Sequence, residues 1–382
     1  MKGHMRNRRT MSAVALICLL AMTACEVAHQ GFDLKSYGKT TAATLVPDGS
    51  VDCTAEIEAM LDAGGTVTLP PGIFLVSRLD AFRTGSILRG SGPLATILKG
   101  NGTDPIIEST GHWFHSARLE DIGIAGLNQA GEIGIHLHDM YSTTNYGGPH
   151  GLHLRNVHVR DVGSHGVVID HLWRSHLEDV QVWCGGDAFR LGGGNTNRLS
   201  GCYAHTVGSG CAGYRINGGQ ATIIGCNGLD AGTNSDWGVF GLDTAVGDPS
   251  VAYLSATLMG CNIEDFTRNG LVIRTGSRIN IRACSFVAPA TGTVAALRYG
   301  YNSTSPTLID ASTSFYSMGA AWANGRAIHM GPGMSPVIIV GDGIAGQPTH
   351  AWSDQYGINM KLPVLTVSYP TYATFQTSLV QP

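Results

Sequence analysis

The sequence predicts an all-β solenoid, in which short strands wind into coils that stack on one another. The main observation is a repeat between Leu154 and Phe286. The first apolar residue of each repeat unit falls at Leu154, Leu177, Leu199, Ile223, Leu258 and Ile281, in steps of 23, 22, 24, 35 and 23 residues. A nearly fixed period of this length is typical of a solenoid. No window of these units has an amphipathic helical period, which excludes a helical repeat.

Composition supports the same fold class. The chain of 382 residues contains 52 glycines, and only 14% of its residues are charged. Glycine supplies the positive φ angles that tight turns between short strands require. Within each unit, Gly, Asn, Asp and Ser separate the strand-forming runs. One extended domain is therefore favoured over the two that length alone would suggest.

The N-terminus predicts export. Residues 1–25 combine a basic stretch, an apolar run too short for a membrane span, and small residues, as in a secretory signal. The ending Met22-Thr23-Ala24-Cys25 resembles a bacterial lipobox, in which the cysteine is lipidated and becomes the first residue. Two destinations stay open: a lipoprotein of the periplasm or outer membrane anchored through Cys25, or a secreted protein.

Charge excludes one class of partner. The chain has 24 Lys and Arg against 28 Asp and Glu, and removal of residues 1–24 takes away four of the cations, so the balance becomes 20 against 28, or −8. Only Lys35, Lys39, Lys99 and Lys361 then remain as lysines. A nucleic-acid partner is not expected for so acidic a chain.

The cysteines fit the repeat better than a disulfide framework. Each of Cys202, Cys226, Cys261 and Cys284 lies three residues after the first apolar residue of its unit, so we expect them to stack inside the coil as small hydrophobic side chains. Cys184 and Cys211 differ, because both lie in the turn before the next strand on adjacent coils. A disulfide between these two is an open alternative.

The stretch before the repeat carries a family resemblance. Residues 32–38 (FDLKSYG), the helical stretch 52–65 (DCTAEIEAMLDAGG), residues 66–77 (TVTLPPGIFLVS) and residues 87–100 (ILRGSGPLATILKG) together resemble the opening of the pectate-lyase-like superfamily of right-handed parallel β-helices. The resemblance implies a strand and helix cap over 26–65, a parallel β-helix over 66–350 and a C-terminal tail over 351–382. A cap is needed physically, since an open solenoid end exposes apolar core and unpaired strand edges.

The same resemblance leaves the chemistry open. The superfamily includes uronate lyases, polygalacturonase-like hydrolases, phage tailspike depolymerases, epimerases and members without known activity, so the fold alone does not choose between them. GSHG with His165 and GGD with Asp187 are similar to parts of the polygalacturonase pattern. However, the histidine coil comes before the aspartate coil, the aspartate is single, and the Asn-Thr-Asp and Arg-Ile-Lys motifs are missing. Polygalacturonase activity is therefore not assigned.

Alternation along the strands predicts a polar outer face. The outward residues expected on successive coils are His136 and His138, then Val168 and Asp170, Arg190 and Gly192, Arg215 and Asn217, Phe240, and Val272 and Arg274. Two insertions, at 140–151 and 243–256, leave the solenoid at the same corner and are expected to stand as walls beside this face.

Two mechanisms fit the residues of this face and the turn before it. Asp187 and Asp236 are expected two coils apart, about 9–10 Å, which suits the acid and the base of an inverting hydrolase. Alternatively, the stacked Arg190 and Arg215 bind a uronate carboxylate, which acidifies the proton on C5, and His165 is the base of a β-elimination. A third interpretation makes Asp170 and Asp187 mere ion-pair partners of the two arginines.

A second face competes for the sugar. Trp183, Tyr203 and His205 are expected to project from the neighbouring sheet, where they would either stack sugar rings or bury against a partner chain in a homo-oligomer. The pair His136 and His138 alone does not predict a zinc site, and none is expected. The sequence leaves calcium open.

Elimination on an acidic polysaccharide is slightly favoured over hydrolysis by the arginine pair. The rival from another class is a carbohydrate-binding or assembly protein without catalysis, which would follow if the side chains of His165, Asp187 and Asp236 pair only with one another or point into the core.

Overall fold

The computed structural model describes most of the chain between residues 45 and 354. The described residues are 45–102, 104–110, 114–138, 149–228, 232–241, 254–274, 277–289, 293–299, 307–310, 313–317, 321–322, 328–330, 337–339 and 352–354. All of them fall within one compact unit, Leu45–Pro382. The expected signal with Cys25, the FDLKSYG stretch and the tail beyond residue 354 lie outside the described residues, as do most of the two expected wall loops.

Strands make up nearly all of the regular secondary structure in the described residues. In chain order the elements are β1 Asp48–Asp52, α2 Thr54–Asp62, β2 Thr66–Thr68, β3 Gly72–Val76, β4 Ile87–Arg89, β5 Thr96–Gly100, β6 Ile107–Thr110, β7 Arg118–Ala125, β8 Ile135–His138, β9 His153–Val162, β10 Val167–Ile169, β11 His176–Glu178, β12 Gln181–Cys184, β13 Phe189–Gly192, β14 Asn197–Ser200, β15 Tyr203–Thr206, β16 Ala212–Asn217, β17 Gly219–Ile224, β18 Asn227–Gly228, β19 Asp236–Phe240, β20 Leu254–Met259, β21 Asn262–Glu264, β22 Asn269–Ile273, β23 Ser277–Arg282, β24 Ser285–Ala288, β25 Thr293–Tyr299, β26 Thr307–Ile309, β27 Ser314–Ser317, β28 Ala321–Trp322, β29 Ile328–Met330, β30 Val337–Ile339 and β31 Trp352–Asp354.

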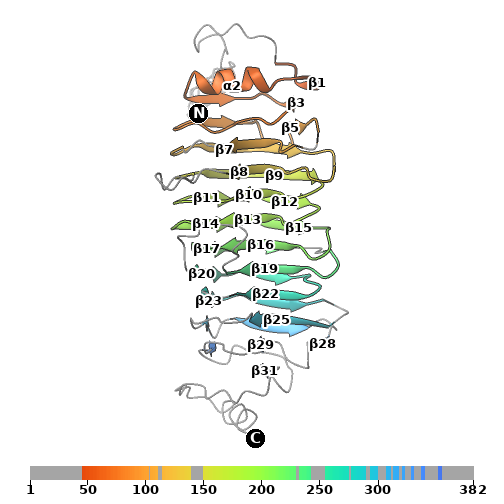
Figure 1. Cartoon of the computed structure of the whole chain (residues 1–382), viewed down its shortest axis with the longest axis vertical. Coiled ribbons are helices and arrows are strands. Elements are labelled where there is room, and N and C mark those ends of the chain that lie inside the picture. The colour runs from red at the N-terminus through yellow and green to blue at the C-terminus, as the bar shows by residue number, and fades with distance from the viewer. Residues whose placement is uncertain are drawn as a thin grey trace, which may run out of the picture. The chain divides into compact units, whose positions relative to one another are not determined.

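Each coil contributes three strand segments to two parallel sheets. In the coil that contains β11, β12 and β13, the first two segments belong to a 20-stranded sheet and the third belongs to an 11-stranded sheet. The 11-stranded sheet runs from β6 through β8, β10, β13, β16, β19, β22, β25 and β29 to β31, and its eleventh strand, β28, pairs with β25 beside this path. Figure 1 shows these strands stacked coil upon coil. The fold is the predicted parallel β-solenoid.

The register confirms the repeat. Leu154 pairs with Leu177, Leu177 with Leu199, Leu199 with Ile223, Ile223 with Leu258, and Leu258 with Ile281. All six side chains are fully buried. Because a slip of one residue would turn each of these side chains outward, burial of this ladder fixes the register of the 20-stranded sheet.

A left-handed residue bends seven successive coils of the described region at the same point. It stands two positions after the first apolar residue and joins the two segments of the 20-stranded sheet, and the residues with positive φ there are Asp121, Asn156, Asp179, Gly201, Gly225, Gly260 and Ala283. Glycine, asparagine and aspartate tolerate this backbone region best. Ala283, with φ 49°, is the exception and is exposed.

We expect Ala283→Gly to stabilise the protein by about 1 kcal/mol, because it relieves the left-handed strain at an exposed residue. Chemical denaturation measures the change. Ala63→Gly is the matched control, since Ala63 is also exposed but has φ −65°. That control should lower stability, and a gain in both variants would contradict the explanation.

The predicted cysteine ladder is confirmed. Cys202, Cys226, Cys261 and Cys284 are buried free thiols, and the Sγ of Cys202 lies 3.4 Å from the carbonyl oxygen of Leu177 in the preceding coil. Cys184 and Cys211 are also free thiols here. Burial raises the pKa of Cys184 to about 12, so this thiol is protonated and unreactive at neutral pH.

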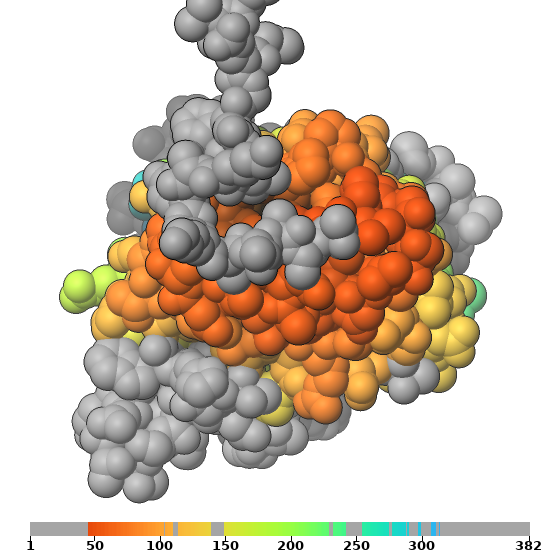
Figure 2. Space-filling view, turned by 90° about the horizontal axis from the view of Figure 1, so that it is seen from above, coloured from red at the N-terminus to blue at the C-terminus, as the bar shows by residue number. Residues whose placement is uncertain are grey.

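Of the cap expected over 26–65, residues 45–65 are described and begin the winding. The helix, expected over 52–65, spans Thr54–Asp62 and buries Ile57 and Leu61 on the first coil, and Figure 2 shows the red and orange residues of this region over the end of the coil. Strand β1 pairs with β3. At Gly72 of the PPG turn, φ is 151° and an added Cβ would lie 2.4 Å from the Cβ of Pro47, so no other residue fits between the two strands there.

Strand pairing continues past the expected end of the β-helix at residue 350. β31, Trp352–Asp354, pairs in parallel with β29. Among the described residues, no helix has the length and hydrophobicity that crossing a membrane requires.

Candidate functional site

The outer face of the 11-stranded sheet carries a continuous row of side chains from neighbouring coils. In register along it are Glu108, His136, Val168, Arg190, Arg215, Val239, Val272 and Arg298. The predicted stacking of His136, Arg190 and Arg215 on this face is confirmed. The expectation for Phe240 is wrong: Phe240 pairs with Ile216 and is fully buried. Arg215 pairs with Val239, 24 residues later, so Val239 is the outward residue of β19 and alternation turns Phe240 inward.

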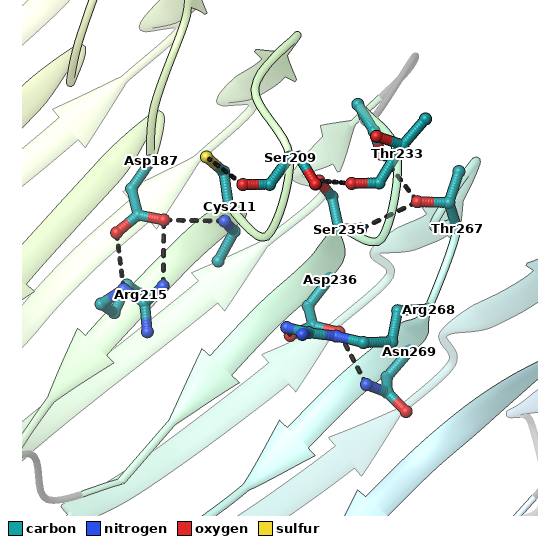
Figure 3. A network of polar contacts seen from close by, with 12 residues as sticks. Asp187, Ser209, Cys211, Arg215, Thr233, Ser235, Asp236, Thr267, Arg268 and Asn269 are labelled. Atoms are coloured by element: carbon teal, nitrogen blue, oxygen red, sulfur yellow. Dashed lines mark hydrogen bonds and ion pairs between the residues drawn. The ribbon is translucent and has the colours of Figure 1, made fainter.

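Asp187 and Arg215 form an ion pair in the middle of this face. The Nε of Arg215 donates to Oδ2 of Asp187 at 2.6 Å and its Nη2 donates to Oδ1 at 3.0 Å. The backbone N–H of Ala212 also donates to Oδ1, at 2.7 Å. Burial acts to raise the pKa of Asp187, but the hydrogen bonds and charge of Arg215 outweigh it and the net shift is downward. Asp187, 5% exposed, is therefore held as a carboxylate (Figure 3).

Asp236 repeats the same arrangement on a later coil. Its carboxylate accepts two hydrogen bonds from Arg268, one of them at 2.9 Å from Nε, and a third at 2.7 Å from the Nδ2 of Asn269. Asp236 is 1% exposed. Ala212, which pairs with Asp236 and donates to Asp187, lies on the coil between the two aspartates, and Figure 3 shows both aspartates with their arginines. The two carboxylates thus lie two coils apart as expected, each bound by an arginine from the following coil.

His165 is fixed in one orientation by the backbone. The N–H of Asp187 donates to its Nδ1 at 2.9 Å. Burial lowers the pKa of His165; the charge of Asp187 opposes that shift, while Arg190 and Arg215 add to it. The ring is therefore neutral at pH 7, and since Nδ1 accepts, the proton of the neutral ring is on Nε2. In this state Nε2 is a hydrogen-bond donor.

Arg190 has no carboxylate partner among the residues that the structure describes. Its Nε is buried and has no hydrogen-bond acceptor, although the next arginine along the row is bound by Asp187. Asp170, expected as an ion-pair partner of the arginines, forms no ion pair with Arg190 in the described region, and its charge acts on His136 instead. The interpretation that Asp170 and Asp187 are only ion-pair partners of the two arginines therefore explains Arg215, which Asp187 binds, but does not explain Arg190.

His136 and His138 lie at the N-terminal side of this row together with Glu108. The two rings stack with centroids 4.2 Å apart, and the Nε2 of His138 lies 2.9 Å from Oε1 of Glu108. Arg78 forms an ion pair with the other oxygen of Glu108. Burial, followed by the charge of His138, lowers the pKa of His136.

The second face is also present as predicted. His158, Gln181, Tyr203, Asn227 and Asn262 form one outward row of the 20-stranded sheet, and Trp183 pairs with His205 in the next row. Trp183 lies 5.6 Å from Tyr203 between ring centroids and 5.9 Å from His158. These half-buried rings face away from the 11-stranded sheet, so Trp183, Tyr203 and His205 do not join the arginine row.

Two participants were missed by the sequence analysis. Glu108 comes from β6, ahead of the detectable repeat, and only the pairing of β6 with β8 places it beside His136. Arg268 precedes β22 and becomes the partner of Asp236 because the turns of the two coils stack. In the sequence each of them appears only as a charged residue beside an otherwise apolar strand. That pattern does not identify a partner until the register of the strands is known.

Comparison with known proteins agrees with the fold. The family described as "Right handed beta helix region" matches residues 134–309, and a search of the curated proteins gives no match. Among solved structures, the A-module of the mannuronan C-5 epimerase AlgE4 of Azotobacter vinelandii has a TM-score of 0.65 at 17% identity, covering 88% of this chain and 99% of that module. The A-module of AlgE6 from the same organism has a TM-score of 0.57 at 16% identity, covering 84% and 97%.

The gp42 tailspike of Acinetobacter phage vb_AbaP_AS12 is also similar, with a TM-score of 0.51 at 15% identity, covering 86% of this chain and 66% of the tailspike. Identities this low support the fold and leave the chemistry to the site. The winding, the family match and these neighbours together show that the chain folds as a right-handed parallel β-helix.

Proposed function

We propose that the protein binds an acidic polysaccharide on the outer face of the 11-stranded sheet and acts on it at a uronate residue. The observation that carries the proposal is Arg190, whose buried Nε lacks an acceptor among the described residues. Buried donors of this kind are nearly always paired, and a planar carboxylate is the partner that a guanidinium binds best. A uronate carboxylate supplies that partner.

Neutralising the carboxylate is also the first requirement for chemistry at the adjacent carbon. Bound to Arg190, it is better able to stabilise the carbanion that forms when the C5–H bond breaks and a base takes the proton. Expulsion of the oxygen on C4 then gives elimination, whereas return of a proton to the opposite face of C5 gives epimerisation. The neighbours named mannuronan C-5 epimerases support an action on C5.

His165 is the titratable side chain placed beside the arginines, and its geometry favours proton donation. With Nδ1 bound to the N–H of Asp187, Nε2–H is able to protonate a departing oxygen. The base role expected from the sequence stays a prediction and requires the other tautomer, which breaks that hydrogen bond.

Replacing His165 separates donation of a hydrogen bond from proton transfer. We expect His165→Ala to lower turnover by about 10²- to 10⁴-fold, the range for losing a general acid or base. His165→Gln retains an amide donor, so if the ring only donates a hydrogen bond, this variant should keep most of the activity. Steady-state rates on a responsive polymer measure both.

Hydrolysis by Asp187 and Asp236 is less well supported by the geometry. A general acid needs a raised pKa, but the pKa of Asp187 is lowered, and both carboxylates are occupied by arginines. The same ion pairs favour a second candidate function, binding of the polysaccharide without turnover, because they leave neither aspartate available to react.

A panel of uronate polymers, mannuronan included, distinguishes these functions. Absorbance of an unsaturated product identifies elimination, a change in the ratio of C5 epimers identifies epimerisation, and reducing ends without that absorbance identify hydrolysis. Binding with no product assigns the protein to the non-catalytic class. If no acidic polymer either binds or reacts, the proposal is wrong.

Export remains part of the proposal, based on residues 1–25. We expect the full chain to fractionate with membranes when Cys25 is lipidated and Cys25→Ser to release it. If neither the parent protein nor Cys25→Ser is found with the membranes, secretion without an anchor is indicated instead.

A further inference from the structure

We propose that Glu108, His136 and His138 form a binding site for one divalent transition-metal ion of the zinc type. The inference is independent of the proposed function, since it needs neither a polysaccharide nor turnover. It rests on three donor atoms, one from each residue, that all lie within 4.8 Å of one another.

The topology brings these donors together. His136 and His138 are alternate residues of β8, so both side chains leave the same face of the sheet. Glu108 of β6 pairs directly with His136 and reaches His138 with Oε1. Two histidines from one strand and a carboxylate from the next provide three ligands on one side of an ion and leave its other positions open.

The distances need only a small adjustment. Bonds of about 2.0–2.1 Å in tetrahedral geometry place two ligand atoms about 3.3 Å apart. The Oε1 of Glu108 and the Nε2 of His138 are 2.9 Å apart, so an ion between them requires an opening of about 0.4 Å. Arg78 binds the carboxylate mainly through Oε2, which orients it and leaves Oε1 directed at the histidine.

The surrounding charges are balanced. Arg78 and Arg190 approach the cluster as cations, and Glu108 and Asp170 approach it as anions. Two imidazole nitrogens and one carboxylate suit zinc, cobalt, nickel or copper, whereas calcium prefers a shell made of oxygen alone. The expectation that the histidine pair does not bind zinc considered two ligands, and the fold adds the third.

A second cluster of the same composition, His153, His176 and Glu178, has a less suitable environment. Arg118 and Arg198 flank it in register, which adds two cations beside one carboxylate. The Nε2 of His176 is already hydrogen-bonded to the Oγ of Ser200 at 3.1 Å, and the Glu178 side chain is 40% exposed. This cluster therefore provides the matched control.

The test is a titration of the chelator-treated full chain with Zn²⁺ by calorimetry, and with Co²⁺ by absorption. We expect one tight equivalent, a cobalt spectrum without a thiolate charge-transfer band, and a higher unfolding temperature in Zn²⁺. Glu108→Gln, His136→Ala and His138→Ala should each weaken binding at least tenfold, whereas His176→Ala should bind as the parent does. Circular dichroism identifies which of the three variants are folded, and any one folded variant suffices.

Three results would overturn the proposal. They are no binding by the parent protein, undiminished binding by a folded Glu108, His136 or His138 variant, and loss of binding in His176→Ala. A thiolate band in the cobalt spectrum would assign the ion to cysteine and count equally against it.

Discussion

Arg190→Ala is expected to weaken binding of an acidic polysaccharide by about 2–5 kcal/mol while leaving the fold intact. The magnitude is that of removing one partner from a desolvated charge pair. The fold should survive because Arg190 is half-buried on the outer face and holds no carboxylate of the described protein. Calorimetric titration of parent and variant with the most tightly bound uronate polymer measures the loss.

Arg198→Ala is the control for this variant. Arg198 lies in β14 of the neighbouring sheet and is exposed, so the substitution removes the same charge from the other side of the solenoid. We expect this control to change affinity by less than twofold, and neutral glucans to be indifferent to both variants. Equal weakening by the two variants would mean that Arg190 acts only through net charge. Loss of thermal stability with full binding would make Arg190 a structural residue, and the search would move to the Trp183 and Tyr203 face.

Asp187→Ala is expected to destabilise the protein by about 3–5 kcal/mol. Removing one partner of a buried ion pair leaves the other charge uncompensated, and here the side chains of Arg215 and Asp187 are only 18% and 6% exposed. The variant also removes the acceptor of the Ala212 N–H. Chemical denaturation with two-state analysis of the folded domain gives the difference in the free energy of unfolding.

Asp62→Ala provides the comparison for a surface pair. Asp62 binds Arg83 at 2.6 Å, but its side chain is 61% exposed, and we expect a loss below about 1 kcal/mol. The double variant Asp187→Ala with Arg215→Ala should be more stable than Asp187→Ala alone, because no unpaired buried cation remains. If the double variant is the less stable of the two, the pair is not the source of the effect.

The same pair predicts how stability depends on pH. The pKa of folded Asp187 is below its ordinary value of 3.8, so unfolding takes up a proton in the interval between the two values. Its contribution is therefore fully present above about pH 5 and is lost as pH falls through the folded pKa. Asp187→Asn, which removes the titration, should lose the parent's extra acid sensitivity when unfolding is followed between pH 6 and pH 3.

The arginine ladder illustrates how far sequence reasoning reaches in this chain. A solenoid repeats its backbone geometry, so a spacing of 23 residues is enough to align Leu154 with Leu177, and one of 25 residues brings Arg190 onto Arg215. The buried cysteine ladder follows from the same repeat, because each cysteine lies three residues after the first apolar residue of its unit. The placement of Phe240 on the outer face was wrong by one residue, because Val239 is the partner of Arg215 and alternation along β19 turns Phe240 inward.

The partners of these residues were decided by contacts between coils. Asp187 was predicted as a catalytic acid or base or as an ion-pair partner, and the sequence had no means of choosing between those roles. The bidentate contact with Arg215 depends on side-chain reach across one strand spacing. The hydrogen bond from its own N–H to Nδ1 of His165 depends on turn geometry. Neither is encoded in residue spacing.

By itself, the sequence determined the class of fold, the inward and outward faces and the row that holds Arg190. These follow from local periodicity, which survives without knowledge of any particular contact. Only the tertiary structure decided that Asp236 is bound by Arg268, that Arg190 lacks a carboxylate among the described residues, and that Glu108 joins His136 and His138. The reason is physical: charge pairing and metal-ligand geometry depend on ångström-scale distances between side chains of different coils, and those distances are set by the packing of the coils.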